Sequence, residues 1–379
     1  MKKVVGLILA LMLLIPVGLY AQVEAAAGSI TIGVHLDAAF RYSAEDKDKG
    51  WNGYETFNGE ALVLGLSGKI GDNLAWRFQE AFILPHYLNS GKSGVYPSTS
   101  ANVPDITVDH PVTLEACAQW KPIDQLGITI GRVLVPTAIA NVPHMLKVHH
   151  MANPPLIITG GFNNDGLFPL PTYQTGVALD INFSGINVNY MLYNGELAGQ
   201  VPLGNDLAQD LDKSKGGNVA VTYNGDVGPG KLTARAFYFQ EYSNIPGDVM
   251  AEDVDDASIS GWGIGVMYDA DNYFGGVEYV TNTLDPEDEG MDSVTGYGYY
   301  ILLGARFSSI EAAFRYDFID WSDLDTDKDT DTETWYNIAV TYLVNDNTGL
   351  GVGYTFKQPE GDDLPNIDEL QVFVELDLL

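Results

Sequence analysis

The chain has 379 residues and a formal net charge of −32, so it is long enough for two soluble domains or one large barrel. Such an acidic composition disfavours nucleic acid and other polyphosphates as partners and favours cations. The single cysteine, Cys117, excludes an intramolecular disulfide, a haem-attachment motif and a zinc ribbon.

The first residues predict export from the cytoplasm. Lys2 and Lys3 precede an apolar stretch at residues 4–20, and small residues follow, so residues 1–25 are expected to be a secretory signal peptide. Cleavage after Ala21 and after Ala25 both fit. An uncleaved anchor is the alternative, although the stretch is short for a span. The rest of the chain lacks the roughly 18 consecutive apolar residues of a membrane helix, so it is expected to stay in the periplasm or to cross a membrane as strands.

Residues 26–379 predict a single all-β domain, because apolar and polar residues alternate with period two along almost all of this length. Pro111 argues against a strand at the first residues of the fourth segment, since proline cannot donate to a ladder. The second and ninth segments are long enough to contain a bulge. About sixteen strands are expected, at residues 30–42, 54–70, 74–84, 107–120, 126–135, 172–183, 186–194, 218–223, 231–242, 261–268, 273–283, 295–307, 310–319, 335–344, 350–356 and 367–378.

The connections between these strands alternate in length. Odd-numbered strands lead into long loops and even-numbered strands into short turns, which is typical of a transmembrane antiparallel β-barrel with short periplasmic turns and long outer loops. Aromatic residues near both ends of the strands indicate two membrane interfaces. They are Trp76, Trp120, Tyr223, Tyr268, Tyr273 and Tyr342 near the turns, and Tyr42, Tyr54, Trp262, Trp321 and Trp335 near the loops. A soluble periplasmic all-β protein is the alternative.

Three segments, at residues 130–136, 154–157 and 173–177, resemble a stretch of Gram-negative outer-membrane porins related to the phosphate-selective family. In that stretch a Gly-basic-x-x-x-Pro strand end precedes a long loop. The resemblance implies a homotrimeric channel whose third long loop, here residues 136–170, folds into the barrel and narrows it. Two features depart from the family. This loop offers only Lys147 where phosphate-selective members line the pore with basic residues, and the chain ends in Leu379 rather than in an aromatic residue.

Charged residues on the predicted inner face are candidates for lining a water-filled pore, in which opposing charges select ions. Arg132 shares its row with Ile128 and Ile130, so only the resemblance adds it to the candidates. The alternative is that these charges pair with one another and hold the strands in register. The candidates are Asp37, Arg41, Arg77, Glu115, Arg132, Asp180, Arg306, Glu311, Arg315 and Asp317 from the strands, with Lys147, His149 and His150 from the loop.

Two groups of residues raise the question of metal binding. The loop histidines His144, His149 and His150 lie near methionines, but their spacing matches no standard site, and packing or pore lining is expected instead. In the seventh long loop, carboxylates recur at every second position and could collect Ca²⁺ or Mg²⁺, although an acidic solvated loop is the simpler interpretation. The weak metal candidates are Asp325, Asp327, Asp329 and Asp331.

The sequence therefore predicts an outer-membrane porin for the passive diffusion of small hydrophilic solutes and ions, with a preference for cations. Its expected surroundings are outer-membrane lipid and lipopolysaccharide, without a resident cofactor and without nucleic acid. The motifs of the common hydrolase, phosphate-binding and zinc-protease sites are absent, so an enzyme is not expected. A substrate-specific channel, for example one for an anion, and a non-conducting structural or adhesive barrel are the alternatives.

Overall fold

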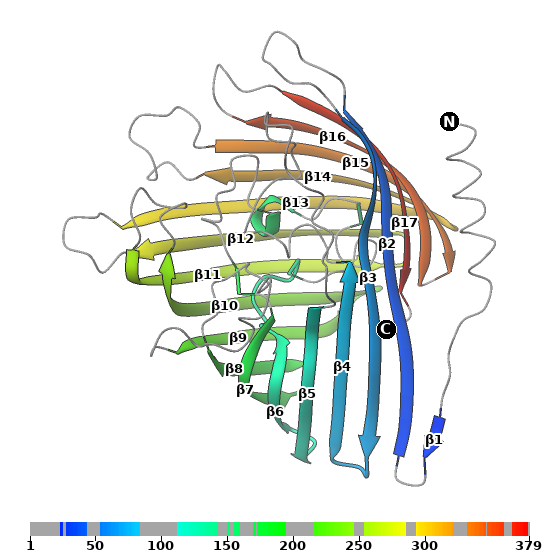
Figure 1. The fold of residues 1–379 in the computed structure, drawn as a ribbon. Coiled ribbons are helices and arrows are strands. Elements are labelled where there is room, and N and C mark those ends of the chain that lie inside the picture. The colour runs from blue at the N-terminus through cyan, green and yellow to red at the C-terminus, as the bar shows by residue number, and fades with distance from the viewer. Residues whose placement is uncertain are drawn as a thin grey trace.

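The computed structural model describes a closed antiparallel β-barrel in which each strand pairs with its neighbours in sequence (Figure 1). Sixteen strands, β2 to β17, form the wall over the described residues, and pairing of β17 with β2 closes it. The described residues are 23–25, 28–43, 54–83, 112–141, 150–151, 155–159, 170–171, 173–194, 215–245, 254–285, 293–320, 332–345, 347–359 and 366–377.

Most strand boundaries lie within four residues of the expected ones, but β11 begins at Val254 rather than at residue 261, and β5 is described only from Val112. A short strand, β1, pairs with the start of β2. The elements are β1 (Val23–Ala25), β2 (Gly28–Ser43), β3 (Tyr54–Ile70), β4 (Leu74–Ile83), β5 (Val112–Ile123), β6 (Leu126–Leu134), α2 (Leu156–Thr159), β7 (Tyr173–Phe183), β8 (Ile186–Tyr193), β9 (Gly216–Val227), β10 (Gly230–Ile245), β11 (Val254–Ala270), β12 (Tyr273–Asp285), β13 (Val294–Phe307), β14 (Ile310–Asp320), β15 (Thr332–Asn345), β16 (Thr348–Pro359) and β17 (Ile367–Asp377).

The two faces of the wall differ in the way that the alternation predicts. Along β17, Leu370 and Val372 point outward and are exposed, while Gln371 and Phe373 point inward and are buried. Successive side chains of a strand point to opposite faces, so one register choice fixes every residue of the row. In the other described strands too, exposed large apolar side chains such as Ile130, Ile264 and Leu303 lie in the outward rows, as a lipid-facing wall requires.

The expected alternation of turns and loops is confirmed. Each even-numbered predicted strand turns within a few residues into the next, while the segments after β2, β4, β6 and the other odd-numbered predicted strands are long. The registers shift in β3, at Glu60, and in β10, between Ser243 and Ile245, the two strands in which the sequence left room for a bulge. Shifts that the sequence did not predict occur in β4, β5 and β15. Within the described residues, the structure contains no helix long and apolar enough to cross a membrane.

Outward aromatic rings form a belt near the loop ends of β11 to β16. Trp262 contacts Tyr279, whose ring lies near Tyr297, and similar contacts lead through Tyr316 to Tyr336 with centroid distances of 5.3–6.1 Å. Trp262 lies in this belt on the outer face, as an interface residue would, and its place at a membrane interface stays a prediction. The prediction for Trp335 is wrong, because its side chain points inward and is buried. Position near the end of a strand does not decide which face a residue occupies, and here the next residue, Tyr336, points outward.

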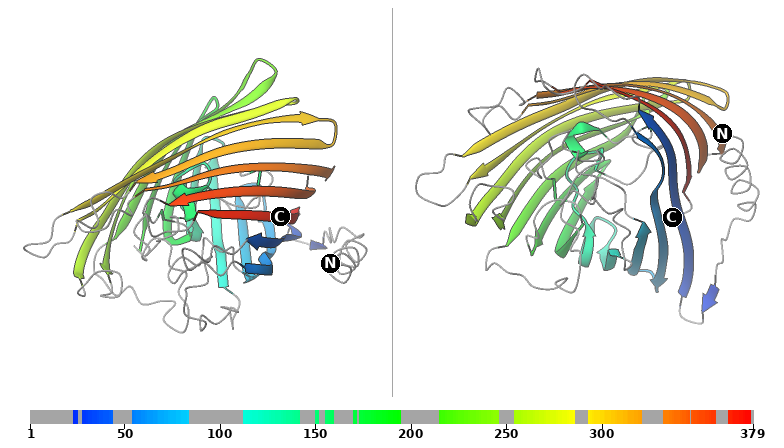
Figure 2. Two further views of the ribbon diagram at one scale, coloured as in Figure 1. Left: turned by 90° about the horizontal axis from the view of Figure 1, so that it is seen from above. Right: turned by 45° about the horizontal axis from the view of Figure 1, so that its top comes forward.

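A hydrophobic cluster lies inside the barrel rather than between two layers. It joins inward-facing wall residues, such as Phe237, Phe274 and Leu302, to residues of the segment between β6 and β7, including Leu156 and Ile157. Figure 2 shows α2, from this segment, enclosed by the curved wall. The described parts of this segment therefore occupy the interior, where they meet the inner faces of β10 to β15.

Candidate functional site

The segment that follows β6 enters the barrel and is held by two wall residues. Glu278 of β12 accepts hydrogen bonds from the backbone N–H groups of Ile139 (2.5 Å) and Ala140 (3.1 Å). Arg235 of β10 donates from Nη1 to the carbonyls of Thr137 (3.2 Å) and Ala138 (3.3 Å). A buried backbone without partners would be costly, so this pair of opposite charges satisfies both the donors and the acceptors of the entering chain.

A glycine in the wall makes room for this anchor. A Cβ atom on Gly265 of β11 would lie 2.7 Å from Glu278 Oε1 and 3.0 Å from Ile139 Cδ1. Gly298 of β13 has a similar role farther along, because a Cβ atom there would lie 2.9 Å from Ile157 Cγ2. These glycines of the inner face let the interior segment approach the wall closely.

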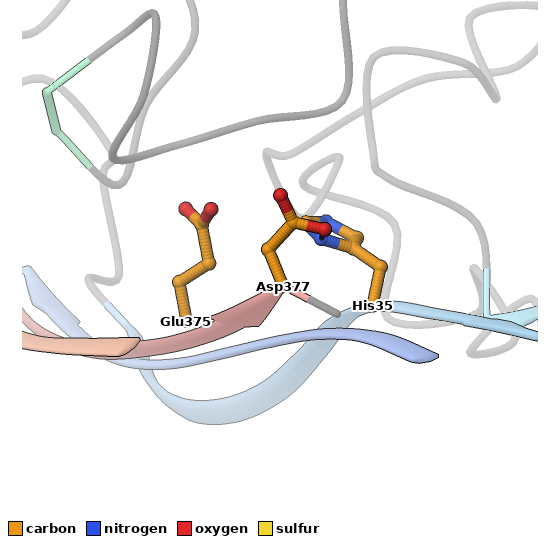
Figure 3. A group of neighbouring side chains, drawn as sticks. All are labelled: His35, Glu375 and Asp377. Atoms are coloured by element: carbon orange, nitrogen blue, oxygen red, sulfur yellow. Dashed lines mark ion pairs between the residues drawn. The ribbon is translucent and has the colours of Figure 1, made fainter. Parts of the chain in front are cut away.

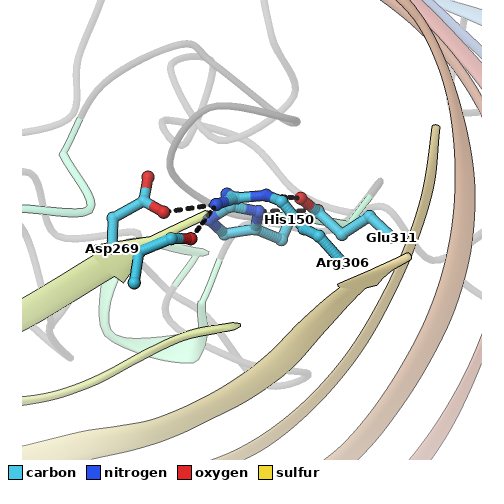
Figure 4. A network of polar contacts seen from close by, with 5 residues as sticks. His150, Asp269, Arg306 and Glu311 are labelled. Atoms are coloured by element: carbon cyan, nitrogen blue, oxygen red, sulfur yellow. Dashed lines mark hydrogen bonds and ion pairs between the residues drawn. The ribbon is translucent and has the colours of Figure 1, made fainter. Parts of the chain in front are cut away.

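A second anchor joins the middle of the segment to β13 and β14 (Figure 4). His150 Nδ1 lies 2.7 Å from Glu311 Oε1, and Arg306 Nε donates to Glu311 Oε2 at 2.9 Å. Arg306 also donates to Asp269 of β11. The His150 ring stacks on Phe274 with a centroid distance of 3.9 Å. Glu311 is thereby shared between a wall arginine and a histidine of the interior segment.

The short helix α2 forms the third anchor. Its first residue, Leu156, donates its backbone N–H to Asp317 Oδ1 of β14 at 3.4 Å, and the helix packs against β13 and β14. Arg315 Nε donates to both carboxylate oxygens of Asp317 at 2.9–3.0 Å, and Asn337 of β15 donates to Asp317 at 2.6 Å. All these groups are buried, so Asp317 links two strands and the helix in one network.

Beyond this region, the inner charges pair between strands instead of holding the interior segment. Near the loop ends, Lys357 of β16 lies 3.0 Å from Glu369 of β17 and 4.7 Å from the Trp335 ring, while Arg41 of β2 lies 3.6 Å from the same Glu369. Across the barrel, Arg77 of β4 lies 3.4 Å from Glu115 of β5. Arg77 is 55% exposed, in contrast with the nearly complete burial of Lys357 and Glu369.

The structure brings most of the predicted lining residues to the inner face. Arg41, Arg77, Glu115, Arg306, Arg315 and Asp317 point inward with the partners given above. Asp180 also lies on this face, where it accepts a hydrogen bond from Asn189 at 2.8 Å. The register pairs Asp37 with Glu375 in the inward row, and the Asp37 side chain is outside the described part.

Three further predictions have other outcomes. The register places Arg132 opposite Ala116 and Thr175, in the same row as the outward Ile130, so its place in the pore stays a prediction. Lys147 and His149 lie outside the described residues. The same is true of the weak metal candidates Asp325, Asp327, Asp329 and Asp331, and of the histidine group apart from His150.

Sequence reasoning missed the wall residues with the most direct hold on the interior segment. Glu278 and Arg235 each occupy an inward position of a well-formed strand, and this position was visible in the alternation. Their partners are backbone atoms 97–139 residues away in sequence. A backbone partner leaves no signal in the types of residue around it, so only the fold could reveal these contacts.

Known proteins share both the sequence pattern and this architecture. A family described as Gram-negative porin matches residues 128–362. No curated protein matches the full sequence. Among solved structures, OmpF of Salmonella typhi in complex with daunomycin is similar with a TM-score of 0.62 and 10% identity, covering 94% of this chain and 100% of that one. The anion-selective porin from Comamonas acidovorans gives a TM-score of 0.61 and 13% identity, covering 93% and 100%. OmpT of Vibrio cholerae gives 0.59 and 9%, covering 94% and 100%.

Proposed function

Because the chain belongs to the Gram-negative porin family, whose members are outer-membrane channels, we propose that it lets small hydrophilic solutes and ions diffuse passively through a water-filled pore. The observation that supports this most directly is the anchoring of the segment after β6 inside a closed barrel. A segment fixed at Glu278, Glu311 and Asp317 narrows the lumen and leaves part of its cross-section open. Residues 136–170 then act as the constriction, and the remaining cross-section conducts.

The proposed preference for cations rests on the balance of charge on the inner face. Among the described residues, the buried charged side chains include nine carboxylates and only three lysines or arginines. Rings or rows of carboxylates favour cations in a pore, because they lower the energy of a positive ion that has shed part of its hydration. The net charge of −32 adds attraction for cations at the mouths of the channel.

One observation favours the competing anion channel. Arg77 has the largest exposed fraction (55%) of the basic residues in the ion pairs of the described strands, so a positive charge meets water on the inner face, as does the carboxylate of Asp269 (57%). The similarity to an anion-selective porin is a similarity of fold, so it does not decide between an anion channel and a cation-preferring one. The apolar cluster inside the barrel favours the third alternative, a non-conducting structural barrel.

The proposal extends to processing and assembly. Residues 1–25 act as the signal peptide, and residues 26–379 form the mature domain in outer-membrane lipid and lipopolysaccharide. The acidic loop that contains Asp325 to Asp331 concentrates Ca²⁺ or Mg²⁺ there. Three copies assemble side by side, a state supported by the trimer form recorded for the similar OmpT of Vibrio cholerae.

Conductance in planar bilayers tests the proposal. The mature protein, folded in detergent and inserted from one side, should give discrete current steps, and a salt gradient should give a reversal potential of the sign expected for cations. A reversal potential of the opposite sign would support the anion channel. Folded protein that gives no current steps would support the structural barrel and contradict the proposed function.

A further inference from the structure

The first and last strands of the barrel wall meet at a cluster of one histidine and two carboxylates (Figure 3). His35 of β2 is the register partner of Asp377 of β17, and Glu375 lies two residues before Asp377 on the same inner face. The exposed fractions of His35, Glu375 and Asp377 are 0%, 1% and 3%. One nitrogen or oxygen atom from each residue lies within 4.8 Å of those of the other two. The alternation of both strands thus directs three potential metal ligands toward one point.

The distance between His35 and Asp377 is close to that between two ligands of one ion. His35 Nδ1 lies 3.6 Å from Asp377 Oδ1, which is longer than the usual hydrogen bond of about 2.7–3.2 Å. Two ligands at about 2.0–2.1 Å from a tetrahedral ion are separated by roughly 3.3 Å, so a small closure of the cluster would bring them to this spacing. The Glu375 side chain has enough rotatable bonds to make the remaining adjustment.

The charge of the cluster also favours a cation. Two carboxylates that are buried so close together repel each other in a medium of low dielectric, and an ion between them removes this cost. A divalent ion bound by His35, Glu375 and Asp377 would balance the two carboxylates directly.

We propose that His35, Glu375 and Asp377 bind a divalent transition-metal ion of the zinc type, which ties β2 to β17 where the barrel closes. A neutral imidazole with two carboxylates is a ligand set that zinc accepts, whereas Ca²⁺ and Mg²⁺ prefer oxygen ligands alone. Three protein ligands leave a fourth position for water. Because the ligands come from the two ends of the mature chain, the ion binds only the closed barrel and stabilises it over the unfolded chain.

Zinc binding to the mature protein, folded in detergent and stripped with a chelator, tests this site. We expect one tightly bound equivalent by equilibrium dialysis with elemental analysis, and a higher unfolding temperature with zinc than with the same concentration of magnesium. In His35→Gln and Asp377→Asn the affinity of the site for zinc should fall at least about 100-fold. Loss of a residue that only hydrogen-bonds to a metal ligand already lowers metal affinity about 10–100-fold. His150→Gln is the matched control, because His150 is another buried histidine beside a carboxylate, and it should retain the equivalent.

Unchanged zinc affinity in both ligand variants, or absence of a tight equivalent in the wild-type protein, would overturn the proposal. X-ray absorption of the wild-type zinc complex gives a result that does not depend on any variant folding. A shell of nitrogen and oxygen with one imidazole supports the site, whereas a shell with two or more imidazoles assigns the zinc to other histidines and overturns it. Neither result depends on whether the barrel conducts.

Discussion

Two parts of the same barrel wall use buried charges for different purposes. In the loop wall, which is the inner face of β10 to β14, Glu278 and Arg235 hold the backbone of the interior segment, and Glu311 holds His150. In the seam wall, which is formed by β15, β16, β17 and β2, Lys357 and Arg41 instead pair with Glu369 of a neighbouring strand.

This difference separates two tasks that a single alternating pattern performs. Charges of the loop wall determine where the interior segment lies, and therefore the width and lining of the lumen. Charges of the seam wall connect β2 to β17 and stabilise the closed barrel, whose closure is the backbone pairing of these two strands. A change in the loop wall is expected to alter transport with a moderate loss of stability, and a change in the seam wall to alter stability with little effect on transport.

The largest effect is expected at Glu369 in the seam wall. Glu369→Ala leaves Lys357 and Arg41 as buried positive charges without this carboxylate, and breaking such a pair typically costs about 3–5 kcal/mol. Urea unfolding in detergent should show this loss. The single-channel conductance of the molecules that fold should equal that of the wild type. A changed conductance with unchanged stability would contradict the division between the two walls.

Glu278 gives the converse prediction in the loop wall. Glu278→Ala removes the acceptor of the Ile139 and Ala140 N–H groups. These groups can bond to water once the segment moves, so the loss of stability should be smaller than in Glu369→Ala. The interior segment should then lose its first anchor, so the single-channel conductance should rise and the open-channel current should become noisier. Glu278→Gln keeps one acceptor oxygen, so its conductance and current noise should lie between those of the wild type and of Glu278→Ala. Identical current traces for all three proteins would show that this anchor does not shape the lumen.

The sequence predicted the rows of both walls but few of the partners. Alternation places Arg315 and Asp317 on one inner face, and they do pair, because residues two apart on a strand are neighbours on that face. The contact of His150 with Glu311 spans 161 residues, and no local pattern encodes it. The incorrect placement of Trp335 has a similar origin, because its position near a strand end is visible in the sequence, whereas the face that it occupies depends on the register.

Substituting alanine for one glycine in each wall is a smaller change that tests the same comparison. In Gly265→Ala of the loop wall, the new Cβ would lie 2.7 Å from Glu278 Oε1, so the anchor must move, at a cost of about 1–3 kcal/mol. In Gly353→Ala of the seam wall, the nearest atom would be Gln371 Oε1 at 3.4 Å, which is an ordinary contact. We expect altered current noise and a lower unfolding midpoint for the first variant only. Equal behaviour of the two variants would indicate that the close approach at Gly265 has no functional consequence.

Arg77 should give the smallest change in stability and a clear change in selectivity. Its ion pair with Glu115 is more than half exposed on the arginine side, although Glu115 is buried, so Arg77→Ala should change the free energy of unfolding by about 1 kcal/mol, less than the variants above. The same exposure lets the guanidinium act on permeating ions, because a charge in contact with water affects the local ion concentration. Its removal should therefore move the reversal potential further toward cations. Arg77→Lys keeps the charge and serves as the control, and equal reversal potentials for all three proteins would place Arg77 away from the ion path.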